Sequence, residues 1–165
     1  MTEQALVAVV LGTDHHRFDR LLGWVRDLQR EGPFRFHVQH GSTPLPAGLA
    51  GSPLLTPSAM ADLLDRASAV VTHGGPGSIM DAREHGHVPV VVPRDPRLRE
   101  HVDDHQQRFA RFVARTGLVV VANDERDLAA RLSLAVLTGR RTPTAHHASP
   151  TLARFEALVE DLVHR

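Results

Sequence analysis

Cysteine and lysine are both absent from this sequence of 165 residues. Without cysteine there is no disulfide framework, no thiolate nucleophile and no cysteine-ligated zinc or iron–sulfur site. Without lysine the chain cannot form a Schiff base, and it cannot supply the lysine of a Walker-type phosphate loop. All 19 basic residues are therefore arginine, and 19 acidic residues balance them to a net charge of zero. Duplex-binding proteins concentrate basic charge, so we expect no nucleic-acid partner.

The sequence also lacks a long hydrophobic run near its start. The first four residues carry no basic charge, and the apolar run 5–11 is short. A signal peptide needs a longer apolar stretch with basic residues before it, and a membrane span needs about 20 apolar residues. We therefore expect a cytoplasmic protein with no direct membrane span. If it works at a membrane, another polypeptide has to hold it there.

Short apolar runs alternate with helical patterns along the chain, whose length is typical of a single domain over residues 1–165. Five runs are typical of strands buried on both faces of a parallel sheet: 5–11, 34–40, 69–72, 88–92 and 118–122. Helices are predicted near 18–28, 58–67, 78–85, 105–116, 124–136 and 152–162, with an irregular connection at 41–57. This order predicts an α/β fold, a Rossmann-like parallel sheet with helices on both faces.

Two glycine-bearing loops follow predicted strands at their carboxyl ends, where open α/β sheets bind ligands. One holds Gly12 and Thr13, and the other covers 74–78. Whether the stretch 34–57 supplies one strand or two decides if the strand ending at Thr72 is third or fourth. With the usual strand order, the two loops would face one another across a single nucleotide-sized crevice.

The second loop is the strongest local signal, because Gly74, Gly75 and Gly77 would let the backbone approach a ligand closely. The helix after it offers unpaired N–H groups to an anion, and Ser78 adds a hydroxyl. The pattern is neither G-x-G-x-x-G nor a Walker loop, which disfavours dinucleotide oxidoreductases and P-loop ATPases. Two interpretations remain open: a phosphate-binding loop, or a tight strand–helix turn in which Ser78 is a cap.

Histidine and carboxylate residues cluster in two further segments. The segment 100–107 (EHVDDHQQ) has the side chains to chelate a divalent metal, although a polar loop ending in an Asp104-capped helix explains it equally simply. Asp14, His15 and His16 follow the first strand beside the expected crevice. A histidine there would serve as a general base, unless this segment is only a solvated loop. A pair at 146–147 is expected to be solvated.

Five segments occur in an order and spacing that resemble the C-terminal domain of family 28 glycosyltransferases, the nucleotide-sugar-binding half of a GT-B enzyme. They are 12–13 (GT), 18–21 (FDRL), 72–78 (THGGPGS), 89–94 (PVVVPR) and 100–106 (EHVDDHQ). The resemblance covers roughly residues 5–135. It is strongest to stand-alone subunits, such as the soluble subunit of dolichol-pyrophosphate N-acetylglucosamine transferase and bacterial exopolysaccharide glycosyltransferase subunits.

The resemblance implies a UDP-sugar donor and assigns parts of its site. The loop 74–78 would receive the diphosphate, Asp81 stands where the family usually has a ribose-binding glutamate, and His105 with Gln106 matches a pair that touches ribose and diphosphate. Relatives carry His-Glu-Gln where this chain has Asp14-His15-His16, so the resemblance itself assigns no catalytic role to this loop. Its catalytic candidates are His15 and His16, chosen as histidines beside the expected crevice. The expected substrate-binding residues are Gly12, Thr13, His73, Gly74, Gly75, Gly77, Ser78, Asp81, Arg94, His105 and Gln106.

The implied reaction is inverting sugar transfer in polysaccharide biosynthesis, with no cofactor and no metal ion. One Rossmann-like domain is half of a GT-B enzyme, so a membrane-anchored partner subunit would supply the acceptor-binding half, recruiting this chain to the inner face of the cell membrane. The acceptor expected from the resemblance is lipid-linked. Two alternatives remain: a non-catalytic UDP-sugar-binding or regulatory module, and a UDP-sugar epimerase on the same scaffold.

Overall fold

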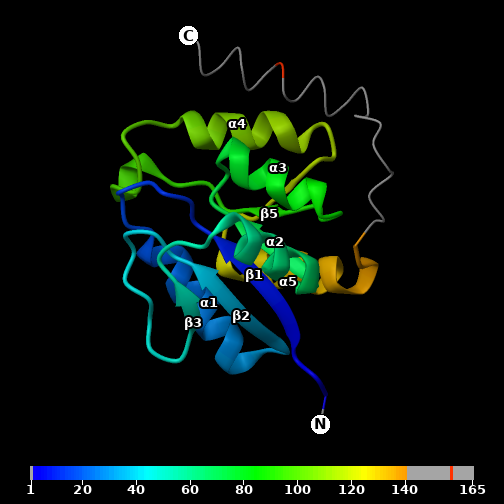
Figure 1. Ribbon diagram of the computed structural model, residues 1–165. Coiled ribbons are helices and arrows are strands. Elements are labelled where there is room, and N and C mark those ends of the chain that lie inside the picture. Colours follow the sequence, from blue (N-terminus) through cyan, green and yellow to red (C-terminus); the bar gives the residue numbers. More distant parts are fainter. Residues whose placement is uncertain (1, 141–156, 158–165) are drawn as a thin grey trace.

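A sheet of six parallel strands in the order β3-β2-β1-β4-β5-β6 organises the molecule (Figure 1). The structure, a computed structural model, describes residues 2–140 and residue 157. The strands are β1 (Ala5–Val10), β2 (Phe34–Gln39), β3 (Ala50–Ser52), β4 (Ala69–Thr72), β5 (Val90–Val91) and β6 (Val120–Val121). The helices are α1 (Asp19–Glu31), α2 (Pro57–Arg66), α3 (Pro76–Glu84), α4 (His105–Ala114) and α5 (Glu125–Thr138), with a 3-10 turn, η1, at Pro96–Leu98.

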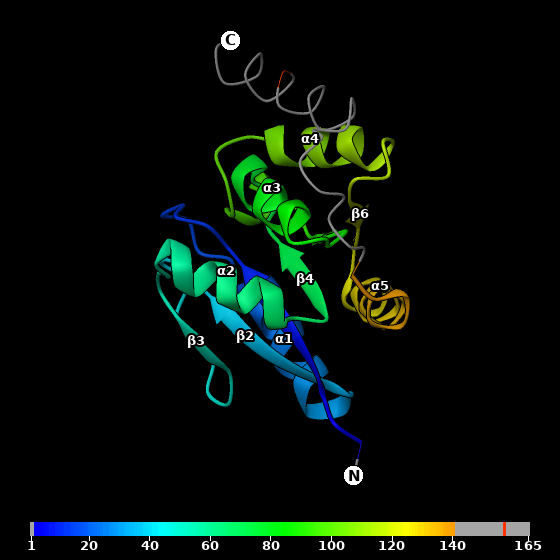
Figure 2. The same cartoon turned by 45° about the vertical axis from the view of Figure 1, so that its right-hand side comes forward.

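The two faces of the sheet are covered by different helices, as Figures 1 and 2 show from two sides. In β1, Val7 and Val9 belong to the same apolar cluster as the buried side chains of α1 and α5. Ala8 points the other way, to a cluster with α2 and α3, because successive side chains of a strand alternate between faces. A third cluster joins α3 and α4 to Val91 on that second face. The predicted Rossmann-like sheet with helices on both faces is confirmed.

The sequence pattern leaves the edge strand β3 undecided, because the stretch 34–57 can supply one strand or two. Strand β3 lies inside the expected irregular connection and pairs with β2 from His37↔Ala50 to Gln39↔Ser52. Its three residues, Ala-Gly-Ser, carry no large apolar side chain. A Cβ at Gly51 would collide with the carbonyl oxygen of Val38. Backbone proximity therefore makes this strand, and apolar patterning cannot reveal it.

The start of helix α3 and the capping of helix α4 also differ from expectation. Helix α3 begins at Pro76, two residues before the predicted start, because proline is favoured in the first turn where its missing N–H costs nothing. Asp104 is the N-cap of α4 but makes no capping hydrogen bond, and the Asp103 carboxylate accepts from His105 N–H instead, at 3.0 Å. The predicted helix at 152–162 and the histidines 146–147 lie outside the described residues. Among the described helices, none is long and apolar enough to cross a membrane.

Candidate functional site

The carboxyl ends of β1 and β4 meet at the point where the strand order reverses. From β1 the chain continues outward to β2 and β3, whereas β4 pairs with the other side of β1 and leads to β5 and β6. The strand ending at Thr72 is therefore the fourth, and the loops after Val10 and Thr72 leave the same edge side by side. This is the place where open α/β sheets bind ligands.

His73 fills the space between the two glycine loops. Its ring is buried, and a Cβ added to Gly12 would lie 2.7 Å from Nε2, while one added to Gly75 would lie 2.5 Å from Cε1. Gly12 also has φ +72°, which disfavours other residues. These two glycines therefore make room for an imidazole, a role that the sequence does not disclose. Burial, reinforced by Arg94, lowers the pKa of His73 to about 4, so the ring is neutral at pH 7.

The N-terminus of α3 is uncapped. Its N-cap, Gly75, has no side chain, and the first intrahelical bond runs from Ile79 N–H to the Gly75 carbonyl, at 3.1 Å. Among the described residues, the N–H groups of Gly77 and Ser78 have no acceptor. Gly77 is exposed, and a Cβ there would meet nothing within 4 Å. Ser78 lies in the first turn rather than at the cap, so the interpretation of Ser78 as a simple cap is wrong.

Gln106 is the predicted site residue that reaches His73 from another element. Its Nε2 lies 3.5 Å from His73 Nδ1, and its Oε1 is buried without a hydrogen-bond partner in the described part of the chain. His105, beside it, is exposed and pairs with Asp103 at 2.8 Å. Asp81 is exposed on α3, one turn after Ser78, and Thr13 is exposed in the first loop. Gly74, with φ +95°, donates its N–H to the Thr72 hydroxyl at 3.0 Å.

Arg94 is a buried cation that ties the loops of this edge together. It donates to the carbonyls of His16 at 2.8 Å, Glu100 at 3.2 Å and Leu11 at 3.4 Å, and its guanidinium lies 4.9 Å from the centre of the Phe18 ring. Burial lowers its pKa, and nearby carboxylates oppose that shift. These contacts give Arg94 a structural role, which is to hold the loops together. Its expected contact with a substrate stays a prediction.

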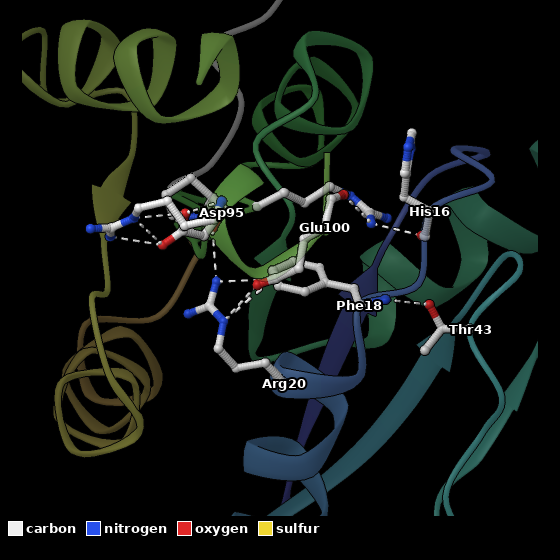
Figure 3. A network of polar contacts seen from close by, with 9 residues as sticks. His16, Phe18, Arg20, Thr43, Asp95 and Glu100 are labelled. Atoms are coloured by element: carbon white, nitrogen blue, oxygen red, sulfur yellow. Dashed lines mark hydrogen bonds and ion pairs between the residues drawn. The ribbon is translucent and has the colours of Figure 1, made fainter. Parts of the chain in front are cut away.

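An ion pair between Arg20 and Glu100 holds α1 against the segment after β5 (Figure 3). Arg20 Nε lies 2.8 Å from Glu100 Oε1, and its Nη2 donates to the Pro93 carbonyl at 3.1 Å. The guanidinium also stacks over Trp24, 4.8 Å from the ring centre. Burial raises the pKa of Glu100, and pairing with Arg20 opposes that shift. The sequence pattern does not indicate this pair, because the two partners lie 80 positions apart.

Gln39 fixes the first glycine loop, although the sequence pattern does not single it out. Its Oε1 accepts from Gly12 N–H at 2.9 Å, and its Nε2 donates to the carbonyls of Gly12 at 2.9 Å and Pro53 at 2.8 Å. Backbone groups therefore use both hydrogens of the Gln39 amide and one acceptor position of its oxygen. A glutamine at the end of a strand was the available signal, but nothing local indicated its partners.

Asp14 gathers histidines from two loops that the sequence analysis treated separately. Its Oδ1 lies 2.6 Å from His16 Nδ1, and its Oδ2 lies 3.3 Å from His101 Nε2. Burial alone would raise the pKa of Asp14, but hydrogen bonds from His16, together with Arg94, hold that pKa below its ordinary value. The His15 ring is exposed and lies 3.8 Å from the same carboxylate. A carboxylate that orients an imidazole is typical of a general base, and these atoms are also potential metal ligands.

The comparisons with known proteins concern the family and the fold. Residues 56–162 match the family model of the glycosyltransferase family 28 C-terminal domain. No curated protein sequence matches the chain.

Three solved structures illustrate the likeness. The glycotransferase of kitacinnamycin has a TM-score of 0.60 at 19% identity, over 99% of this chain and 40% of that one. The spinosyn forosaminyltransferase SpnP has a TM-score of 0.58 at 18% identity, over 98% of this chain and 39% of that one. The solution structure of ALG13 has a TM-score of 0.58 at 20% identity, over 99% of this chain and 98% of that one. The chain thus spans about two fifths of the first two transferases and nearly all of ALG13. At these low identities the structural similarity shows a shared fold alone.

Proposed function

Because the chain belongs to the glycosyltransferase family 28 C-terminal domain family, we propose that it is the donor-binding subunit of an inverting glycosyltransferase that uses a UDP-sugar. The observation that carries the proposal is the uncapped N-terminus of α3 at the β1–β4 switch point. Two N–H groups there, at Gly77 and Ser78, have no acceptor among the described residues, and the space beside Gly77 is open. An anion such as a diphosphate would satisfy both groups and lie at the positive end of the helix dipole.

Around that anchor the neighbouring polar groups would hold the nucleoside. Asp81 lies one turn further along α3, where a carboxylate would accept from ribose hydroxyls. Gln106, whose Nε2 lies 3.5 Å from Nδ1 of the neutral His73, would form the inner wall of that site. The proposed site therefore uses backbone N–H groups, hydroxyls, amides and carboxylates, and it calls for no cofactor and no metal ion.

In the proposed reaction an acceptor hydroxyl attacks the anomeric carbon as the bond from that carbon to the diphosphate breaks. The electron pair of the broken bond stays on the departing UDP, whose growing charge the N–H groups of α3 stabilise. His16, oriented by Asp14, is the candidate base for the hydroxyl proton, with His15 beside it. Each lost contact to the departing diphosphate should cost about 2–4 kcal/mol in the transition state.

A partner polypeptide completes the proposal. The chain spans about two fifths of the kitacinnamycin glycotransferase and of the spinosyn forosaminyltransferase, so the described sheet corresponds in extent to one of their parts. We place the acceptor site, for a lipid-linked acceptor in polysaccharide biosynthesis, on a membrane-anchored partner. It would recruit this cytoplasmic subunit to the inner face of the cell membrane. The resemblance to stand-alone subunits supports this arrangement.

Calorimetric titration of the purified chain with UDP, ADP, GDP and dTDP tests the donor site. We expect UDP to bind, and Ser78→Ala and Gln106→Ala each to weaken it. Ser133→Ala is the matched control, because Ser133 is exposed on α5 and its hydroxyl donates to the Ala129 carbonyl at 3.0 Å. Unchanged UDP affinity in both site variants would refute the pocket. UDP binding with no transfer by the assembled complex would favour the non-catalytic module, and full transfer by the isolated chain would refute the need for a partner.

A further inference from the structure

Two loops at the rim of the crevice bring three imidazoles to one carboxylate. Asp14, His15 and His16 belong to the loop after β1, and His101 belongs to the segment between η1 and α4. The first three residues offer ligand atoms that all lie within 4.8 Å of one another. His101 Nε2 lies 3.3 Å from the second oxygen of Asp14, and the His16 and His101 rings are 5.6 Å apart.

We propose that Asp14, His15, His16 and His101 form a binding site for one divalent transition-metal ion of the Zn²⁺ class. Imidazole nitrogens with a single carboxylate oxygen are donors that suit zinc, nickel or copper, whereas Mg²⁺ and Ca²⁺ prefer sites made of oxygens. Four ligands of this kind complete a tetrahedral zinc site. The reaction proposed above needs no such ion, so this is a separate property of the chain.

The distances require only a small rearrangement. Bonds of about 2.0–2.1 Å at tetrahedral angles place neighbouring ligand atoms about 3.3 Å apart. The His101–Asp14 pair already has a separation of 3.3 Å, and His15 lies at 3.8 Å. The hydrogen-bonded pair of His16 and Asp14, at 2.6 Å, must open, with the ion replacing the shared proton. His101, which faces the other Asp14 oxygen, must turn toward the group formed by Asp14, His15 and His16. The His15 side chain is 86% exposed, so it is free to turn toward the ion.

The surroundings hold two of the ligands in place. Asp103 Oδ1 lies 3.6 Å from His101 Nδ1, so a carboxylate backs the ring nitrogen opposite the one that faces Asp14. A small movement of Asp103 would close this gap to a hydrogen bond, which is the carboxylate–histidine contact that orients metal-ligating imidazoles. Arg94 fixes the backbone of the first loop through the His16 carbonyl at 2.8 Å. A bound ion would join the two loops and occupy the candidate base, so we expect it to inhibit transfer.

Metal titration of the chelator-treated full-length chain tests the proposal. We expect one equivalent of Co²⁺ to give the visible absorption of a four-coordinate nitrogen–oxygen site, and one equivalent of Zn²⁺ to displace it. Asp14→Asn and His101→Ala should each weaken Zn²⁺ binding by more than the roughly 10–100-fold typical of losing an outer-sphere partner. His15→Ala alters an exposed side chain, so it tests the same ligand set without endangering the fold.

Two controls separate this site from adventitious binding. His85→Ala removes a histidine that pairs with Asp65 at 2.7 Å and belongs to a different part of the surface, and it should leave the stoichiometry and affinity unchanged. The double variant His146→Ala/His147→Ala should do the same. Zn²⁺ binding that survives both Asp14→Asn and His101→Ala, or that disappears in the 146/147 double variant, would overturn the proposal.

Discussion

The variant Gly77→Ala should make the protein more stable and a poorer UDP binder. A methyl group at position 77 meets nothing within 4 Å, and glycine costs up to about 1 kcal/mol relative to alanine inside a helix. In the first turn of α3 we expect a gain of about 0.5 kcal/mol. Because Cα–Cβ bonds tilt toward the helix N-terminus, the methyl enters the space from which an anion would approach. Losing one charge-assisted hydrogen bond costs about 1.5–3 kcal/mol, or roughly a 10- to 100-fold higher Kd.

Gly23→Ala is the matched control, since Gly23 lies in α1 and its added Cβ also meets nothing within 4 Å. Urea denaturation should show both variants to be at least as stable as the parent, and calorimetry should show weakened UDP binding for Gly77→Ala alone. Parental UDP affinity in Gly77→Ala would refute the claim that a diphosphate sits against the start of α3. Weakened binding in Gly23→Ala would show that stability, rather than access, controls affinity.

Three further variants test the scaffold around the site. Arg20→Ala should cost about 3 kcal/mol in urea denaturation, because it leaves the Glu100 carboxylate buried without its cation, and Glu100→Gln added to it should recover part of the loss. Gly12→Ala should be destabilising by about 1–3 kcal/mol, from its positive φ and the clash with His73, and His73→Ala should relieve only the clash. His73 has a folded-state pKa of about 4 against 6.5 when exposed, so the unfolded chain binds its proton first. Stability should therefore fall by roughly 3 kcal/mol between pH 6.5 and 4, and a His73→Asn variant should lack that part of the decline.

The sequence predicts the elements whose signals are local. The pattern predicts strand β4 and the glycine loop after it, because the run Ala-Val-Val-Thr is followed, after His73, by glycines and a proline. No distant partner is needed to recognise that pattern. The fold class follows from the alternation of such segments. The start of α3 was misplaced because Ser78 is an attractive cap, whereas Pro76 and the backbone of Gly75 begin the helix.

The site's internal contacts depend on side chains that meet only after folding. Arg20 and Glu100 lie 80 positions apart, and Arg94 reaches the His16 carbonyl across 78. The sequence gives no sign that the two histidine segments meet, although Asp14 contacts a histidine of each. No periodicity encodes such pairs. The glycine pattern likewise indicated a close approach, but it did not indicate that His73, a residue of the same loop, makes it.

The cation buried at position 94 bears on how the rim of the crevice comes apart. Its carbonyl partners come from the early segment of the chain, at Leu11 and His16, and from the later one, at Glu100. If one loop opened and Arg94 stayed buried beside Phe18, the guanidinium would lose carbonyl acceptors, at a cost of about 3–5 kcal/mol. The hydrogen-bonded amides of the rim, such as His16 N–H on the Asp14 carboxylate, should therefore exchange with solvent more slowly than those of an ordinary surface loop.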